Sequence, residues 1–368
     1  MTAMKYTRVS ICSTALAAPP TKIPQPCAVS GAERLLFAVT ARETALFFPD
    51  ADPDFSEADA CEWFDGKQHP EPGDWLRQLE CFRPTVLVTC WDTPRIPEEF
   101  IGSKGCSLRY ICHLTGSPRH IVPRSFLARG GLLTNWGRLA GAPVAEQALL
   151  LALAGLRNMG FWRSYIRRKS RDSDWPIVDL GARSLFNRRV GLHGFGHVAQ
   201  TLTQLLRPFH VTLSAYSEGV PRELMRSAGV TPCDSLAELF STSDILFECE
   251  ALTPKSEGCV DARILSALPD GAVFVNVGRG RVVDEPALLH EVRQGRIRAA
   301  LDVVSEEPVS EQSEVMRVPG LVVSPHIGGP TPDRFPLCGR FALQNLRNYF
   351  NGEPLEALVT LEIFDRST

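Results

Sequence analysis

Three side chains in the C-terminal half of the chain have the chemistry that reduction of a ketone beside a carboxylate requires: Arg279, Glu307 and His326. A guanidinium such as Arg279 can donate two parallel hydrogen bonds to the carboxylate and polarise the adjacent carbonyl. An imidazole such as His326 can give a proton to the alkoxide that forms when hydride arrives. Glu307, in contact with the other ring nitrogen, would fix the tautomer. Each residue type is also common in ion pairs, turns and strand ends, so spacing alone leaves a catalytic and a structural role equally open.

A hydride donor is predicted by the glycine-rich stretch RRVGLHGFGHVAQ, residues 188–200. Gly194 permits a tight turn, Gly196 lets the backbone approach a pyrophosphate, and the small Ala199 lets helix and strand pack closely. The motif follows an expected strand, opens an apolar helix and leads to a second strand. This context favours a nicotinamide dinucleotide whose phosphates face the helix N-terminus.

The residues that distinguish NAD from NADP depart from the usual pattern. An acid that accepts hydrogen bonds from the ribose is expected about 20 residues after the glycines. There the chain has Ser217 and Glu218. Ser217 cannot repel a 2′-phosphate by charge, whereas Glu218 can, and Arg222 could stabilise such a phosphate if the loop folds back. We expect NAD as the cofactor, with NADP as the open alternative.

The elements that must position these residues are strands and helices in alternation, which predicts an α/β fold with parallel sheets. The expected strands of a first region are 34–40, 85–90, 108–114 and 131–135. Those of a second region are 188–194, 211–216, 244–252, 272–278, 298–304 and 321–328. Six strands predict a doubly wound dinucleotide-binding domain, with its ligands at the carboxyl ends of the strands. We expect an apolar helix from Pro143 and a surface excursion around a short helix at 49–75.

The composition is that of an ordinary globular protein. The 368 residues are 44% hydrophobic with a net charge of −3, which is enough for two domains. The near-neutral charge gives no reason to expect nucleic acid or a membrane surface as partner, and no stretch is expected to reach the length of a transmembrane span. Eleven cysteines without C-x-x-C spacing indicate a reducing, cytoplasmic compartment and no metal site.

Two further segments are expected to have no catalytic part. Residues 1–32 are interpreted as a poorly ordered extension rather than a secretory signal. The basic run 161–175 is interpreted as a solvated face or a subunit contact rather than an anion site.

Five longer strings resemble the D-isomer-specific 2-hydroxyacid dehydrogenase family in order and spacing. They are VAEQALLLALAGLRN (144–158), VGLHGFGHVAQ (190–200), the segment 252–288, ALDVVSEEPV (300–309) and VSPHIGG (323–329). The resemblance implies a flavodoxin-like substrate domain, 33–139 and 333–368, into which a Rossmann cofactor domain, 140–332, is inserted. It implies an NAD(P)-dependent homodimeric enzyme that interconverts a 2-oxo acid and a D-2-hydroxy acid. Glyoxylate, hydroxypyruvate and larger 2-oxo acids all remain open as substrates.

The resemblance also implies which residues form the site. Catalysis would fall to Arg279, Glu307 and His326, with Asp302 at the nicotinamide carboxamide. The set implied for the cofactor is Gly194, Gly196, His197, Val198, Ser217, Glu218, Ala251, Val277, Asp302, His326, Gly328 and Gly329, with His197 and Val198 at the pyrophosphate. The set implied for the substrate is Trp91, Thr115, Gly116, Ser117 and Arg279.

Departures from the family pattern bear on the substrate. Phosphoglycerate dehydrogenases tend to have an arginine where this chain has Cys90, Trp91 and Asp92, which argues against a phosphorylated substrate. Trp91 would either close the cleft over an apolar group or pack in the hinge. An NAD(H)-sensing regulatory protein on the same fold remains the alternative function. Formate oxidation is disfavoured, because it pairs the histidine with glutamine rather than with Glu307.

A second departure lies in the third expected strand of the cofactor domain. Cys249 and Ala251 replace the usual histidine and proline. We expect the two acids beside them, Glu248 and Glu250, at solvated positions at the strand end.

Overall fold

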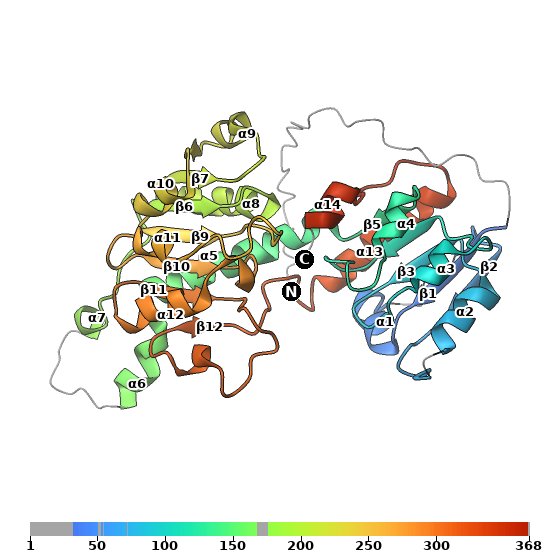
Figure 1. Ribbon diagram of the computed structural model, residues 1–368, viewed down its shortest axis with the longest axis horizontal. Helices are drawn as coiled ribbons and strands as arrows, with labels where there is room; N and C mark the ends of the chain where they lie inside the picture. Colours follow the sequence, from blue (N-terminus) through green and yellow to red (C-terminus); the bar gives the residue numbers. More distant parts are fainter. Residues whose placement is uncertain (1–31, 51–52, 54, 72, 168–175, 367–368) are drawn as a thin grey trace, which may run out of the picture.

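The computed structural model describes residues 32–50, 53, 55–71, 73–167 and 176–366, which form two α/β units, each built on a parallel sheet (Figure 1). Apart from Ala32, the expected N-terminal extension lies outside the described residues. So does the part of the basic run at 168–175.

The first unit contains a five-stranded sheet in the order β2-β1-β3-β4-β5, the flavodoxin-like order. Its strands are β1 (Arg34–Ala38), β2 (Ala60–Trp63), β3 (Val86–Thr89), β4 (Tyr110–His113) and β5 (Leu132–Thr134). Its helices are α1 (Ala41–Phe47), α2 (Asp74–Phe82), α3 (Glu98–Gly102) and α4 (Arg124–Ala128). Thr40 and Glu43 form a capping box that starts α1 directly after β1.

Strand β2 corrects the expectation of a surface excursion at 49–75. It pairs in parallel with β1 at the edge of the sheet, and Trp63 stacks on Phe37 with ring centroids 4.2 Å apart. Three of its four residues are exposed, so it lacks the alternating or apolar pattern by which strands are recognised.

The C-terminal helices return to this first unit. Helix α13 (Phe335–Phe350) packs against α1 and β4, and α14 (Leu361–Arg366) packs against α4 (Figure 1). The chain therefore leaves the first unit, builds the second and comes back, so the second unit is inserted into the first.

The second unit contains a seven-stranded sheet in the order β12-β11-β10-β9-β6-β7-β8. Its strands are β6 (Arg189–His193), β7 (Thr212–Tyr216), β8 (Thr231–Pro232), β9 (Ile245–Glu248), β10 (Val273–Asn276), β11 (Arg298–Leu301) and β12 (Val322–Val323). Read from β8, this is the doubly wound dinucleotide-binding order, extended by β12. The order reverses between β6 and β9, and ligands of such sheets bind at this crevice.

The prediction of six strands was therefore one short. Strand β8 is only two residues long and ends in proline on the outer edge of the sheet, which leaves almost no pattern to read. The strand that carries Glu248 is the fourth of this sheet along the chain, not the third.

Helices cover both faces of the second sheet. The helices of this unit are α5 (Gly141–Leu156), α6 (Trp162–Arg167), α7 (Pro176–Asp179), α8 (His197–Leu206), α9 (Arg222–Ser227), α10 (Leu236–Ser241), α11 (Ala262–Ser266) and α12 (Glu285–Arg293), of which α6 and α7 lie away from the sheet (Figure 1). The apolar helix α5 begins two residues before the expected Pro143.

Helix α5 also corrects the expectation about membrane-spanning length. With the preceding 3₁₀ turn it makes a helical segment, Gly137–Leu156, that by length and composition alone could cross a membrane. In this structure α5 packs against α8, β10 and β11, with Ala145, Ala148 and Ala152 fully buried. A core helix passes the same test of length and composition.

Candidate active site

A cavity of about 880 Å³ lies between the two units. Its wall on the first unit is formed by Trp91, Thr115, Gly116, Ser117, Arg119, His120 and Trp136. Its wall on the second unit and on the return to α13 is formed by Arg279, His326, Ile327, Gly329, Pro330, Thr331, Pro332 and Phe335. All five predicted substrate residues and two of the predicted catalytic trio therefore face one cavity.

Arg279 is delivered to this cavity by the loop after β10. Its Nη1 donates to the Gly278 carbonyl at 2.7 Å, and burial lowers the pKa of the guanidinium while the charge of Glu307 opposes that effect. The next residue, Gly280, lies against the loop after β11, where a Cβ would come within 1.9 Å of the Val304 carbonyl carbon. Only glycine allows the two loops to approach so closely, and this brings Arg279 towards Glu307.

Glu307 completes the trio from behind His326. Its Oε2 lies 2.6 Å from Nδ1 of His326, and its Oε1 accepts the Val304 N–H at 3.0 Å. Because an ionised carboxylate only accepts hydrogen bonds, Nδ1 carries the proton and Nε2 is left for a substrate. The predicted contact between Glu307 and His326 is present.

His326 itself has a constrained backbone. Its φ is +53°, in the left-handed region that non-glycine residues rarely adopt. The buried carboxylate of Asp302 organises this loop, because Oδ1 accepts from the Ile327 N–H at 3.0 Å and Oδ2 from the Gly328 N–H at 2.8 Å. A Cβ on Gly328 would come within 2.7 Å of Oδ2, so glycine is needed there. Asp302 thereby positions His326, whatever contact it makes with a cofactor.

The glycine loop after β6 has the geometry that a pyrophosphate requires. Gly194 has φ of +83°, and a Cβ on Gly196 would meet no atom within 4 Å, so the space above the loop is open. Gly196 precedes α8, whose first backbone N–H groups lack intrahelical partners. Burial and nearby Arg138 lower the pKa of His197, the first residue of α8. These residues fit a dinucleotide.

Two other predicted cofactor residues lie near strand ends. Val277 follows β10 and is buried, and Ala251 is half-buried in the loop after β9. Gly329 lies near Trp136 at the junction of the two units. The cofactor contacts proposed for these residues stay predictions.

Charged side chains in and after the loop that follows β7 form ion pairs with other residues of this chain. Glu218 pairs with Lys255 at 3.2 Å, and Arg222 pairs with Asp234 at 2.5 Å. The loop has therefore not folded back to place Arg222 where it would meet a phosphate. Ser217 donates to Glu250 Oε2 at 3.3 Å.

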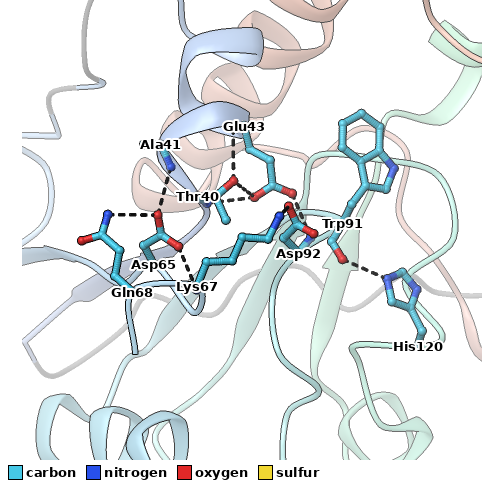
Figure 2. Close-up of polar contacts among 9 residues, drawn as sticks. All are labelled: Thr40, Ala41, Glu43, Asp65, Lys67, Gln68, Trp91, Asp92 and His120. Atoms are coloured by element: carbon cyan, nitrogen blue, oxygen red, sulfur yellow. Dashed lines mark hydrogen bonds and ion pairs between the residues drawn. The ribbon is translucent and has the colours of Figure 1, made fainter. Parts of the chain in front are cut away.

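Trp91 lines the cavity because its loop is held from behind (Figure 2). The buried carboxylate of Glu43 accepts the Asp92 N–H at 2.9 Å, and Lys67 pairs with the Asp92 side chain at 2.5 Å. His120 Nε2 lies 3.4 Å from the Trp91 carbonyl oxygen. The indole, 41% exposed, thus faces the cleft.

The second loop predicted to bind substrate, residues 115–117, offers backbone groups to the cavity. The Thr115 hydroxyl lies 2.7 Å from His113 Nε2 in the core, and burial lowers the pKa of His113 to about 3. A Cβ on Gly116 would come within 2.9 Å of Trp136 Nε1, so glycine lets that indole lie against the loop. The side chain of Thr115 is engaged inside the protein, which leaves the backbone of 115–117 to meet a substrate.

The expectation that Glu248 is solvated was wrong. Its side chain is fully buried, and its Oε2 lies 2.5 Å from Nδ1 of His193, the last residue of β6. Burial alone would lower the pKa of His193, but the charge and hydrogen bond of Glu248, with help from Glu250, raise it. The pair lies directly beneath the glycine turn, and the two residues are 55 positions apart, so no local pattern reveals it.

The second unit is similar to a known domain. Residues 149–328 match the family model described as D-isomer specific 2-hydroxyacid dehydrogenase, NAD binding domain. Hydroxyphenylpyruvate reductase of Plectranthus scutellarioides is 30% identical over 229 residues, which cover 62% of this chain and 70% of that protein. Human glyoxylate reductase/hydroxypyruvate reductase is 26% identical over 275 residues, 74% of this chain and 84% of that protein.

The similarity to phosphoglycerate dehydrogenases is partial in length. The D-3-phosphoglycerate dehydrogenase of Methanocaldococcus jannaschii is 26% identical over 234 residues, 63% of this chain but only 44% of that protein. Among solved structures, a glyoxylate reductase from Paecilomyes thermophila has the same fold, with a TM-score of 0.71 at 21% identity over 90% of this chain and 99% of that one.

The His193–Glu248 pair should make stability depend on pH. Replacing Glu248 alone by leucine leaves an unpaired buried imidazole, and we expect a loss of about 3–5 kcal/mol in the free energy of unfolding. The double variant His193→Leu, Glu248→Leu should recover most of the lost free energy of unfolding. The Glu250 N–H, which donates to Glu248 at 2.9 Å, loses its acceptor in both variants, so their difference isolates His193. Urea denaturation measures both.

Because the pKa of His193 is raised in the folded state, the pair stabilises the protein fully below pH 6.5, and this stabilisation is lost as pH rises through the folded value. The wild type should lose more stability than the double variant over that interval. If the free energy of unfolding fell equally with pH in the wild type and in the double variant, the pairing would be contradicted.

Proposed function

The chain belongs to the D-isomer-specific 2-hydroxyacid dehydrogenase family, and we propose that it transfers a hydride between NAD(P)H and a 2-oxo acid to give the D-2-hydroxy acid. The observation that carries the proposal is the His326–Glu307 hydrogen bond of 2.6 Å, with His326 and Arg279 on the wall of one cavity. An imidazole, a carboxylate and a guanidinium in this arrangement can bind a 2-oxo acid and supply its proton.

The second unit would hold the dinucleotide with its pyrophosphate at Gly196 and the N-terminus of α8. When bound there, the dinucleotide supplies the hydride. Asp302 keeps the 326–328 loop in place through its hydrogen bonds to the Ile327 and Gly328 N–H groups.

Arg279 and His326 act on the substrate from the second unit. The guanidinium of Arg279 binds the carboxylate and the carbonyl oxygen of the 2-oxo acid. Nε2 of His326 donates a proton to that oxygen as negative charge develops on it, and Glu307 stabilises the ring through Nδ1. In the reverse direction the same nitrogen takes the proton from the hydroxyl.

The cavity wall favours an acid with an apolar side chain. Trp91 lies edge-on to Trp136 with ring centroids 6.4 Å apart, and edge-on to Phe335 at 5.5 Å. These rings, with Ile327, offer apolar contact that glyoxylate is too small to use. We propose a larger 2-oxo acid, aliphatic or aromatic, as the substrate.

Assembly as a homodimer is proposed through the cofactor domain. Helices α6 and α7 lie at the end of the second unit that is remote from the first unit (Figure 1). They expose Trp162, Ile166, Ile177 and Val178, of which Ile166 is 75% exposed. A second copy of this chain is the partner that we propose to cover them, as the family resemblance implies.

A cytoplasmic location is part of the proposal. In the described part of the chain all nine cysteines are free, and three of them, Cys90, Cys112 and Cys338, are buried. Free thiols in this number are typical of a reducing compartment.

Substituting His326 with alanine should lower kcat by about 10²- to 10⁴-fold because the proton donor is lost. The affinity for NADH should stay nearly unchanged. Steady-state absorbance of NADH and fluorescence titration measure the two quantities. The exposed His290 on α12 supplies the matched control, His290→Ala. Normal turnover in His326→Ala would refute the mechanism, and tight dinucleotide binding by a wild type that turns over no acid would favour the NAD(H)-sensing alternative.

A panel of 2-oxo acids should separate the substrate classes. We expect kcat/KM for 4-methyl-2-oxopentanoate or phenylpyruvate to exceed that for glyoxylate by about tenfold or more. Each methylene buried in the apolar cavity adds binding free energy in the transition state. Trp91→Ala should reduce this preference, whereas Phe186→Ala, which removes an exposed ring of the second unit outside the cavity, should preserve it. A preference for glyoxylate or a phosphorylated acid would overturn the substrate proposal.

The dimer proposal is tested by light scattering coupled to size exclusion. The wild type should elute with twice the mass of one chain, and Ile166→Asp should shift it to the monomer because a charge is placed in the apolar contact. Ile363→Asp, at an exposed apolar position on α14, is the control and should remain dimeric. A monomeric wild type would contradict the proposal.

A further inference from the structure

Ser217 stands after β7, where an acid that binds the ribose is expected. The carboxylate of Glu250, from the segment after β9, lies beside it. In the sheet β6 is flanked by β7 and β9. Gly194 follows β6 and Ser217 follows β7 directly, and Glu250 is the second residue after β9. Carboxyl ends of parallel strands meet at one edge, and the contacts agree. A Cβ on Gly194 would come within 2.7 Å of the Glu250 nitrogen, and the Ser217 hydroxyl lies 3.3 Å from Glu250 Oε2.

The Glu250 carboxylate has a defined orientation and can accept further hydrogen bonds. Its Oε1 accepts the Ala251 N–H at 3.0 Å, which holds the side chain, and the residue is half-buried. Among the residues that the structure describes, the one hydrogen-bond donor to its Oε2 is the Ser217 hydroxyl. Since each oxygen of an ionised carboxylate can accept two hydrogen bonds, Oε2 can take a ribose hydroxyl beside Ser217 or in its place.

The charges nearby do not favour a phosphate. Within the described ranges, no lysine or arginine nitrogen lies within ion-pair distance of Glu250. Lys255 is paired with Glu218, which is 69% exposed, and Arg222 is paired with Asp234. A third cation, Arg366, lies against the loop after β7, since its Nη2 would be 3.5 Å from a Cβ on Gly219, and it pairs with Glu362 at 3.3 Å. Each of these three cations is thus paired with an acid.

From these contacts we propose that Glu250, and not a residue of the loop after β7, binds the ribose hydroxyls of the adenosine and excludes a 2′-phosphate. The chain then selects NAD(H) over NADP(H), with Ser217 as a second ribose contact. A 2′-phosphate carries about −1.5 to −2 charges, so placing it beside this half-buried carboxylate is unfavourable. The inference rests on the proposed dinucleotide function and adds its cofactor specificity.

The test measures binding of ADP-ribose and of 2′-phospho-ADP-ribose by calorimetry to the full chain, because neither ligand can react. We expect the wild type to bind ADP-ribose about tenfold or more tightly than its phosphorylated form. The isosteric variant Glu250→Gln should bring the two affinities to within about threefold, since it removes the repulsive charge. The matched control Glu218→Gln, on the loop after β7, should keep the wild-type ratio.

A second variant distinguishes the effect of the carboxylate charge from an effect of misfolding. Glu250→Asp keeps the charge on a shorter side chain, so it should retain the preference for ADP-ribose while binding both ligands less tightly. Thermal unfolding of each variant confirms that it is folded, and this aspartate variant keeps the proposal testable if Glu250→Gln does not fold.

Other results would overturn the inference. A wild type that prefers the phosphorylated ligand, an unchanged ratio in Glu250→Gln, a narrowed ratio in Glu218→Gln, or loss of the preference in Glu250→Asp would each do so. Failure of the wild type to bind either ligand would overturn the dinucleotide function with it. Selective binding without NADH oxidation by any 2-oxo acid would contradict the catalytic function alone and leave the role of Glu250 supported.

Discussion

The hydrogen bonds of the buried Asp302 carboxylate are the interactions on which the geometry of the proposed catalytic site depends. This carboxylate stands at the end of β11 and accepts hydrogen bonds from the Ser324 hydroxyl and from two backbone N–H groups of the loop that carries His326. This loop holds His326 with φ of +53°, a conformation that needs such support. With His326 fixed, Glu307 can meet its Nδ1 while its own second oxygen is tied to the Val304 N–H.

The two units contribute unlike surfaces to the cavity between them. The second unit brings the charged groups, Arg279 and His326, from the carboxyl ends of its strands. The first unit brings Trp91 and Trp136, and α13 adds Phe335 as the chain returns. Polar chemistry on one wall and aromatic rings on the other fit a substrate with a carboxylate at one end and an apolar group at the other. The chain crosses between the units twice, and on its return α13 packs on α1 and β4 of the first unit, which places Phe335 on the cavity wall.

Two acids at the carboxyl end of β9, Glu248 and Glu250, have different surroundings. Glu248 faces into the core, where its Oε2 contacts His193 Nδ1, and its second oxygen accepts the Glu250 N–H. Glu250 faces the crevice beside Ser217. The buried pair therefore holds the backbone from which Glu250 reaches the ribose position, so a stability element and a proposed specificity element share one short segment.

Local patterns in the sequence were enough to predict the α/β class and the glycine turn at Gly194, because each depends on a short run of residues around a strand end. The catalytic role of Arg279, Glu307 and His326 was inferred through the family resemblance and stays a prediction, although the structure does place Glu307 against His326. Long-range pairing had to come from the tertiary structure. Strand β2 is mostly exposed and is a strand only because β1 lies beside it. Glu248 reads as a polar residue at a strand end until β6 places His193 against it, and the environment of Glu250 is likewise decided by β7 and the loop after it. Sequence determines which side chains stand at each strand end, whereas the order of strands in the sheet decides which of them meet.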